Sequence, residues 1–437
     1  MSNRVTLIGN AVHVAEKDPY EGIGETEQKR LAKYLRIRKV EDKWAISPKP
    51  RYAGLLNVGG TTYWLEPPFS PASFVYLLLR YKGITGLADQ AYLLASSREN
   101  RSIEDLMQVL SVLMVDTARV LASGHIAQSY LRKVDRLGVI RGRPLWHRQG
   151  RRPADGTVIC QFDEKSTDTL ENRLVRAGLD AAARWLPTGA DNTGLRTQQF
   201  VWHALAEPYY PSPHDFDIAD IRLNRLTFGY KNALSIARAL LFGFDLNAPK
   251  PDTHIVAPVF DLSILFEQLV GLVAAAAVSG TDLTVTSQSS ERRAIVTRVN
   301  ETYRAIRPDL IIKRLEQPVL VIDSKFKPKY AEGGPRPGGY NKMSREDIFQ
   351  TFFYAHRIAQ RSGLTLPIPA AIAAPKLTDL PAPLEDYRHV HWGEDVETSG
   401  TRLSLVLVPV DQAVQAVIRR DVGYCREILE STGVLST

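Results

Sequence analysis

The stretch RPDLIIKRLEQPVLVIDSKFK, residues 307–327, decides the fold of the C-terminal part of the chain. Two apolar runs flank the polar turn RLEQP, and this pattern predicts a β-hairpin. If the hairpin is centred on Glu316, then Ile311 lies opposite Val321 and Asp309 lies opposite Asp323. Directly opposed residues have Cβ atoms about 5 Å apart. The sequence therefore predicts that two carboxylates meet at the open end of the hairpin.

Lys325 shares a strand face with Asp323, because side chains two positions apart point the same way. Two neighbouring carboxylates repel each other unless a cation lies between them. Oxygen ligands suit Mg²⁺, with Mn²⁺ as an alternative ion, and such a metal can activate water against a phosphodiester. Lys325 can orient that water and neutralise the developing charge. We therefore expect Asp309, Asp323 and Lys325 to be catalytic; the alternative is an ordinary hairpin with charged ends.

Three more side chains belong to the predicted site. Glu267 lies in an apolar helix expected over residues 262–278, where a carboxylate is costly unless it is paired or metal-bound. It is predicted as a third metal ligand, and the alternative is a place on the wet edge of the helix. Gln350 and Tyr354 lie four residues apart on one face of a helix expected over 345–361. They can reach a metal-bound water or a phosphate, or can simply form a polar helix face.

The surrounding sequence predicts a mixed α/β fold. After about residue 252 an apolar helix is followed by strands, the helix 345–361 and two more apolar strands, which indicates a mixed central sheet flanked by helices. Residues 1–155 are expected to form an α+β domain, with a hairpin turn at Gly59-Gly60. Residues 156–250 are expected to be a helical connecting region, and residues 251–437 the third domain.

Composition narrows the class of protein. The 437 residues exceed one ordinary core, and 55 Lys plus Arg against 48 Asp plus Glu give a net charge of +7, which favours an anionic partner. Residues 131–153 are strongly basic, either as a solvated surface, which we favour, or as a phosphate-contacting or partner-contacting patch. No signal peptide or membrane span is expected, so a cytoplasmic protein is predicted. No phosphate-binding G-x-x-x-x-G-K-[ST] loop occurs. The pair His389 and His391 lacks nearby cysteines, which argues against zinc.

Several motifs together resemble the McrC family, the nuclease subunits of McrBC-type modification-dependent restriction systems. The resemblance covers nearly the whole chain and rests on these elements in order: YAGLLNVGGTTYWLEP; DTLENRLVRAG with Asp168, Asn172 and Arg173; FGYKNALSIARALL with Tyr230; Phe266-Glu267; Pro308-Asp309; Asp323-Ser324-Lys325; and Asp347-Ile348-Phe349-Gln350 with Tyr354.

The resemblance implies a PD-(D/E)xK endonuclease core in residues 251–437 that cuts DNA. It also implies a partner, a McrB-like AAA+ GTPase hexamer that the N-terminal part binds and stimulates. Two alternatives remain. A stand-alone repair or recombination nuclease is disfavoured by the large non-nuclease part, and a non-catalytic adaptor that activates a motor is disfavoured by the intact set Asp309, Asp323 and Lys325.

Overall fold

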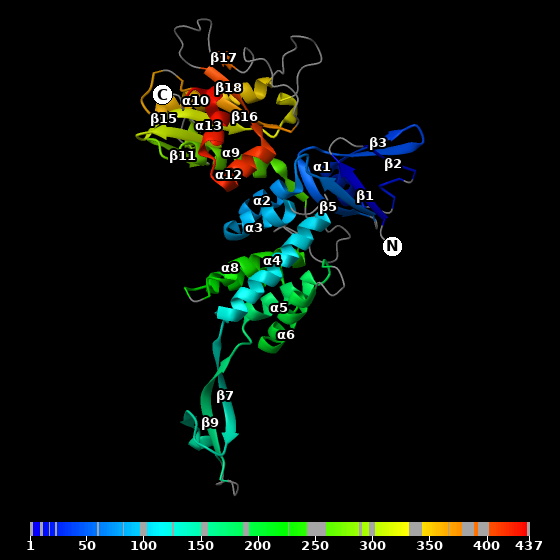
Figure 1. The fold of residues 1–437 in the computed structure, drawn as a ribbon, viewed down its shortest axis with the longest axis vertical. Helices are drawn as coiled ribbons and strands as arrows, with labels where there is room; N and C mark the ends of the chain where they lie inside the picture. The colour runs from blue at the N-terminus through cyan, green and yellow to red at the C-terminus, as the bar shows by residue number, and fades with distance from the viewer. Residues whose placement is uncertain are drawn as a thin grey trace. The chain divides into compact units, whose positions relative to one another are not determined.

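The chain forms two compact units, one built from residues 1–96 and 254–437 and the other from residues 97–253 (Figure 1). The computed structural model describes residues 3–434, except 9–11, 17, 22–23, 59–60, 82, 97–102, 125, 150–155, 187–191, 226, 243–258, 288–290, 297–301, 332–342, 366, 378–388 and 392–401.

A six-stranded mixed sheet is the centre of the first unit. Its order is β11-β14-β15-β16-β18-β17, with parallel pairing from β15 through β16 to β18 and antiparallel pairing elsewhere. The predicted mixed α/β architecture is confirmed at this level. The strand bounds are β11 Leu283–Ser287, β14 Leu310–Arg314, β15 Gln317–Ser324, β16 Ala370–Lys376, β17 His389–His391 and β18 Arg402–Pro409.

The hairpin β14–β15 has the predicted register near its open end, where Ile311 pairs with Val321. The turn differs in detail from a loop centred on Glu316. Leu315 and Glu316 form a two-residue turn with φ of 46° and 68°, and an irregularity after Ile312 shifts the pairing by one residue. Positive φ at both turn positions matches the twist of the strands but strains side chains other than glycine and asparagine.

Helices cover both faces of this sheet. Helix α10 (Arg345–Arg361) packs on the face that carries Ile311, Val321 and Ile372. Helix α9 (Leu262–Ala277) packs against β11 and β15, and a Cβ on its Gly271 would lie 3.6 Å from Leu310 Cδ2. Helices α12 (Val410–Arg419) and α13 (Val422–Leu429) pack on α9. The helices predicted over 262–278 and 345–361 are therefore confirmed.

The first 96 residues complete the same unit with two small sheets and three helices. In the sheet β1-β6-β5-β10, strand β10 pairs with β5 and leads directly into α9, and Asp261 at the start of α9 lies 2.6 Å from Arg51. Strands β5 and β6 form the predicted hairpin, whose turn at 59–60 lies outside the described residues. The bounds are β1 Asn3–Ile8, β2 His13–Ala15, α1 Glu25–Tyr34, β3 Leu35–Val40, β4 Lys43–Pro48, β5 Tyr52–Val58, β6 Thr61–Glu66, α2 Pro71–Tyr81, α3 Thr85–Ser96 and β10 Val259–Asp261, and β12 Glu291–Val296 pairs with β13 Thr302–Ile306 as a ribbon.

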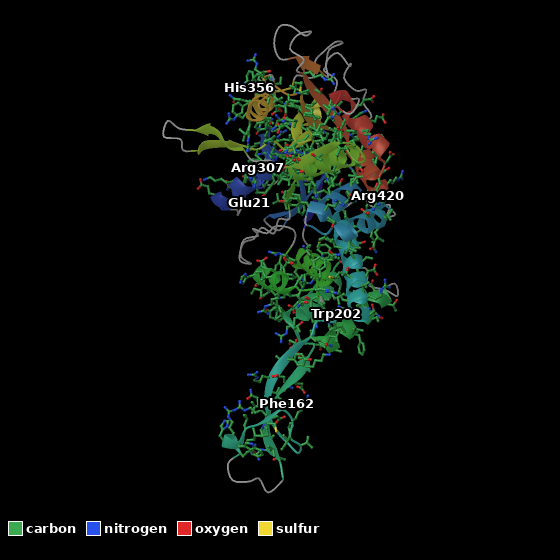
Figure 2. The ribbon with its side chains drawn as sticks, turned by 90° about the vertical axis from the view of Figure 1, so that its left-hand side faces the viewer. Glu21, Phe162, Trp202, Arg307, His356 and Arg420 are labelled. Carbon is green, nitrogen blue, oxygen red and sulfur yellow. The ribbon has the colours of Figure 1, made fainter. Side chains whose placement is uncertain are left out.

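The second unit is a helical bundle with a long β-hairpin. The hairpin consists of β7 (Ser129–Leu137) and β9 (Val158–Ser166), with β8 (Arg143–Pro144) beside β9 and the short helix η1 (Trp146–Arg148) after it. Figure 2 labels Phe162 on the hairpin and Trp202 in the bundle, where the indole is fully buried. The helices are α4 Ile103–Gly124, α5 Leu170–Ala182, α6 Thr193–Leu205, α7 Pro213–Arg222 and α8 Tyr230–Phe242.

The grouping of the chain differs from the predicted domain boundaries. Helix α4 packs against α5, α6 and α8, so residues after 96 belong with the helical bundle rather than with an N-terminal domain that ends at 155. Residues 1–96 instead group with the C-terminal sheet, because β10 and α9 continue the N-terminal sheet. None of the helices in the described residues is long and apolar enough to cross a membrane.

A buried polar cluster joins the hairpin to the bundle; we call it the Asn172–Tyr230 cluster. The Tyr230 hydroxyl donates to Asn172 Oδ1 at 2.6 Å and accepts from the Ala127 amide at 2.8 Å. Asn172 Nδ2 donates to the carbonyls of Ala127 and Thr167 at 2.9 and 2.5 Å. Burial raises the pKa of Tyr230 to about 12, so its hydroxyl stays protonated. The cluster holds the chain just before β7 and just after β9.

Candidate active site

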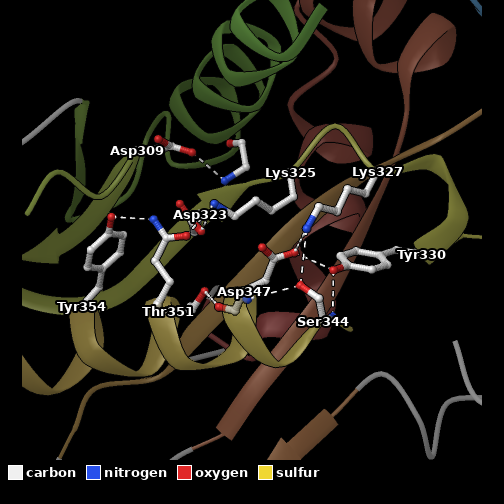
Figure 3. A network of polar contacts seen from close by, with 11 residues as sticks. Asp309, Asp323, Lys325, Lys327, Tyr330, Ser344, Asp347, Thr351 and Tyr354 are labelled. Carbon is white, nitrogen blue, oxygen red and sulfur yellow. Dashed lines mark hydrogen bonds and ion pairs between the residues drawn. The ribbon is translucent and has the colours of Figure 1, made fainter. Parts of the chain in front are cut away.

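The carboxylates of Asp309 and Asp323 and the ammonium of Lys325 meet at the open end of the β14–β15 hairpin (Figure 3). Asp309 Oδ2 accepts a hydrogen bond of 2.6 Å from the Ser324 amide, which fixes it beside the end of β15. Lys325 Nζ lies 2.8 Å from Asp323 Oδ2. Alternation along β15 and the predicted register place all three as the sequence indicated.

The two carboxylates are buried in a site that is short of positive charge. Burial, and next the negative charge of Asp323, raise the pKa of Asp309 to about 7. Asp323 is 2% exposed, and its burial raises its pKa although Lys325 opposes the shift. A carboxylate with a raised pKa in a polar site is a signature of a functional position, because a purely structural pair tends to be compensated.

Gln350 and Tyr354 reach the same site from helix α10. Lys325 Nζ donates to Gln350 Oε1 at 2.9 Å, and Gln350 Nε2 donates to the Tyr354 hydroxyl at 2.7 Å. Burial raises the pKa of Tyr354, so its hydroxyl remains a neutral donor. The predicted shared helix face therefore places both side chains next to Lys325.

Glu267 is half-buried on α9, and its negative charge adds to the rise in the pKa of both Asp309 and Asp323. It therefore lies within electrostatic range of the pair. Within the described residues, however, no three or more His, Cys, Asp or Glu side chains gather closely enough to hold a metal ion. The structure thus brings Asp309 and Asp323 together but does not draw Glu267 into a closed three-ligand group.

The paired carboxylates fit a hard divalent cation. Mg²⁺ binds through one or two carboxylates and keeps several waters, so Asp309 and Asp323 suffice as protein ligands. A cation would also relieve the repulsion that contributes to the raised pKa of Asp309. The donor set is all oxygen, which favours Mg²⁺ or Mn²⁺ over zinc.

A second polar group lies beside this site and includes residues for which the sequence predicted no role. Asp347 Oδ2 accepts from Lys327 Nζ at 2.6 Å and from the Tyr330 hydroxyl at 2.5 Å. The Ser344 amide donates to the Tyr330 hydroxyl at 2.8 Å. The available sequence signal was the spacing of three between Asp347 and Gln350, which places both on one helix face. Lys327 and Tyr330 gave no such signal, because their contacts depend on the path of the chain after β15.

Comparison with known proteins places this geometry in a family. The family model for "McrBC 5-methylcytosine restriction system component" matches residues 45–366. No curated protein matches the chain. One similar solved chain belongs to a refined half-complex from a tetradecameric assembly of Thermococcus gammatolerans McrB AAA+ hexamers with bound McrC. It has a TM-score of 0.62 and 14% identity, with 97% of this chain and 100% of that chain covered.

A second similar chain comes from a cryo-EM structure of the Thermococcus gammatolerans McrBC complex, with a TM-score of 0.43, 18% identity, and 61% of this chain and 85% of that chain covered. At these identities the solved structures show likeness of fold, whereas the family model spans most of the sequence and confirms the resemblance drawn from the motifs. The chain belongs to the family of McrBC 5-methylcytosine restriction system components.

Proposed function

We propose that this chain is the McrC-type nuclease subunit of a McrBC-like restriction complex and hydrolyses phosphodiester bonds of DNA with Mg²⁺ or Mn²⁺. The observation that carries the proposal is the buried pair Asp309 and Asp323 with Lys325 on the same strand end. This is the arrangement that a PD-(D/E)xK nuclease core requires. Family membership supports the restriction role.

In the proposed reaction Asp309 and Asp323 hold the metal, and Glu267 adds negative charge near it. When bound, the ion lowers the pKa of a water ligand and offsets charge on the phosphate. The Lys325 ammonium has three N–H donors, of which Asp323 and Gln350 engage two. No third partner is found among the described residues, so one donor remains for a phosphate oxygen.

Gln350 and Tyr354 orient the lysine rather than change its charge. The amide of Gln350 accepts from Lys325 and donates to Tyr354, so each group has one defined direction. Fixed donors cost little reorganisation when charge develops on the phosphate, which is why such positioning lowers the barrier. The lysine and the two α10 residues are therefore assigned to binding and stabilising the reacting phosphate.

The β7–β9 hairpin is the proposed contact with a McrB-like AAA+ GTPase hexamer. It exposes large apolar side chains among its basic residues, with Tyr130 and Val139 each 72% exposed and Trp146 66% exposed. Exposed apolar surface rimmed by charge is typical of a protein-binding surface. The apolar side chains favour a partner-contacting role over the solvated surface expected from charge alone. The solved neighbour, taken from an assembly of McrB hexamers with bound McrC, supports this kind of partner.

The test is cleavage of plasmid DNA by the full chain with the McrB-like GTPase of its system, GTP and Mg²⁺. Asp323→Asn and Lys325→Gln should each lower cleavage by roughly 10³-fold while DNA and partner binding persist. Glu316→Gln, on the exposed turn of the same hairpin, is the matched control and should cut normally. Cleavage that survives both site substitutions would refute the assigned site. Cleavage by the chain alone would favour a stand-alone nuclease, and partner activation without cleavage would favour an adaptor.

A further inference from the structure

Two ties connect the chain that leaves β15 to helix α10, and they run side by side. The first joins Lys325 to Gln350 at 2.9 Å, and the second joins Lys327 to Asp347 at 2.6 Å (Figure 3). The lysines are two residues apart on one segment, and their partners are three residues apart on one helix face. Any shift of the second tie is therefore transmitted to the first.

The second tie is the stronger of the two. It joins full charges, and the Asp347 side chain is only 7% exposed, so its solvent screening is small. Hydrogen bonds from Lys327 and Tyr330 outweigh the burial of Asp347 and hold its pKa below the usual value. Asp347 is thus ionised and fully engaged, unlike Asp309, whose pKa is raised to about 7.

The same group also fixes the start of α10. The Ser344 hydroxyl accepts from the Asp347 amide at 3.3 Å as the helix cap, and the Ser344 amide donates to Tyr330 at 2.8 Å. The Thr351 hydroxyl donates to the Asp347 carbonyl at 2.8 Å. An α-helix rises 1.5 Å per residue, so an anchor at Asp347 sets Gln350 about 4.5 Å further along the axis.

We propose that Asp347, held by Lys327 and Tyr330, is a positioning residue that locks α10 so that Gln350 directs the Lys325 ammonium at the reacting phosphate. The inference rests on the proposed nuclease function and adds to it a group that does not touch the reacting atoms. The pairing of Lys327 with Asp347 also keeps a second ammonium away from Asp323, so that Lys325 alone serves the carboxylate pair.

The first readout is kinetic. In the full complex with partner, GTP and Mg²⁺, Asp347→Asn and Lys327→Gln should each lower kcat for DNA cleavage by about 100-fold, as misplacement by about 1 Å does, with KM for DNA unchanged. The double variant should be no slower than either single variant, because both remove one tie. Glu316→Gln, which removes an exposed ion pair in the same sheet, should change nothing. Multiplicative losses in the double variant, or wild-type kcat in Asp347→Asn, would overturn the proposal.

The second readout does not depend on cleavage. Amine acylation of the full chain, quantified by mass spectrometry, should label Lys325 several-fold faster in folded Asp347→Asn than in the wild type, while exposed Lys43 is labelled equally. Unchanged labelling of Lys325, or equal acceleration at Lys43 through general loosening, would overturn the proposal. If the wild-type complex fails to cut DNA but Lys325 labelling rises selectively in Asp347→Asn, the nuclease proposal fails and the positioning role stands.

Discussion

The chain contains two buried polar clusters of opposite character. In the Asn172–Tyr230 cluster every side-chain group that is drawn inside finds a neutral hydrogen-bond partner. At Asp309 and Asp323 two acids are buried together, and burial and mutual repulsion raise the pKa of Asp309 to about 7. The first cluster stabilises the fold, whereas the second stores electrostatic repulsion that a bound cation would relieve.

This difference predicts opposite signs for the removal of polarity. A substitution in the neutral cluster leaves buried groups without partners and lowers stability. A substitution that removes charge from the acidic pair relieves repulsion and raises the stability of the metal-free chain, at the expense of function. The predictions below test these signs, from the largest expected effect to the smallest.

Asn172→Ala should lower the free energy of unfolding of the second unit by about 4 kcal/mol, because several buried groups each lose a partner at roughly 1–3 kcal/mol. Trp202 is buried with its ring centroid 6.4 Å from that of Tyr230, so its fluorescence during urea unfolding reports this unit. Gln199→Ala, on an exposed helix face, is the control. A loss no greater than that of the control would contradict the structural role of the cluster.

Asp309→Asn should raise the stability of the metal-free chain by roughly 2–3 kcal/mol at pH 8 and change it little at pH 4. The folded pKa of about 7 exceeds the unfolded value near 3.8, so the native state holds the proton more tightly. The wild type should therefore lose stability as pH rises from about 4 to 7 and change little above 7 through this group. Hydrogen exchange of β15 in EDTA measures the effect, and a wild type that gains stability over this window relative to the variant would refute it.

The combined change Leu315→Asn and Glu316→Gly should stabilise the β14–β15 hairpin by about 1 kcal/mol. Both positions have positive φ, which asparagine and glycine adopt with less strain. The turn lies at the opposite end of the hairpin from the carboxylates, so cleavage should be unchanged. Thermal unfolding and the plasmid assay measure the two properties, and reduced cleavage would show that turn strain contributes to the site.

Asp217→Asn should change stability by no more than about 0.5 kcal/mol, because its ion pair with Arg238 is largely solvated. Urea unfolding followed through Trp202 gives the value. A loss as large as that of Asn172→Ala would show that charge, rather than buried hydrogen bonding, dominates the second unit.

The sequence predicted the parts of the site that depend on local periodicity. Alternation along β15 placed Asp323 and Lys325 on one face, and helical spacing placed Gln350 with Tyr354. The turn at Leu315 and Glu316 could not be resolved, because a one-residue irregularity compensates for the shorter loop. The contacts of Lys327 and Tyr330 with Asp347 were missed because they join segments separated by more than ten residues, with no shared period.

The domain boundaries were also beyond the reach of local patterns. Residues 1–96 and 254–437 form one unit although 157 residues separate them, and their union depends on the pairing of β10 with β5. A composition shift along the chain reports neighbours in sequence, whereas this unit is defined by neighbours in space. Glu267 shows the same limit, since its place near the acidic pair depends on how α9 packs on the sheet.

The insertion of the second unit within the first sets an order of events during synthesis. Residues 97–253 leave the ribosome as one continuous stretch, before any residue of β14, β15 or α10 has been made. Domains generally fold as units as the chain emerges. The bundle and its hairpin can therefore be complete while the acids at 309 and 323 are still untranslated, so a polypeptide interrupted midway carries the proposed partner-binding surface but no cleavage centre.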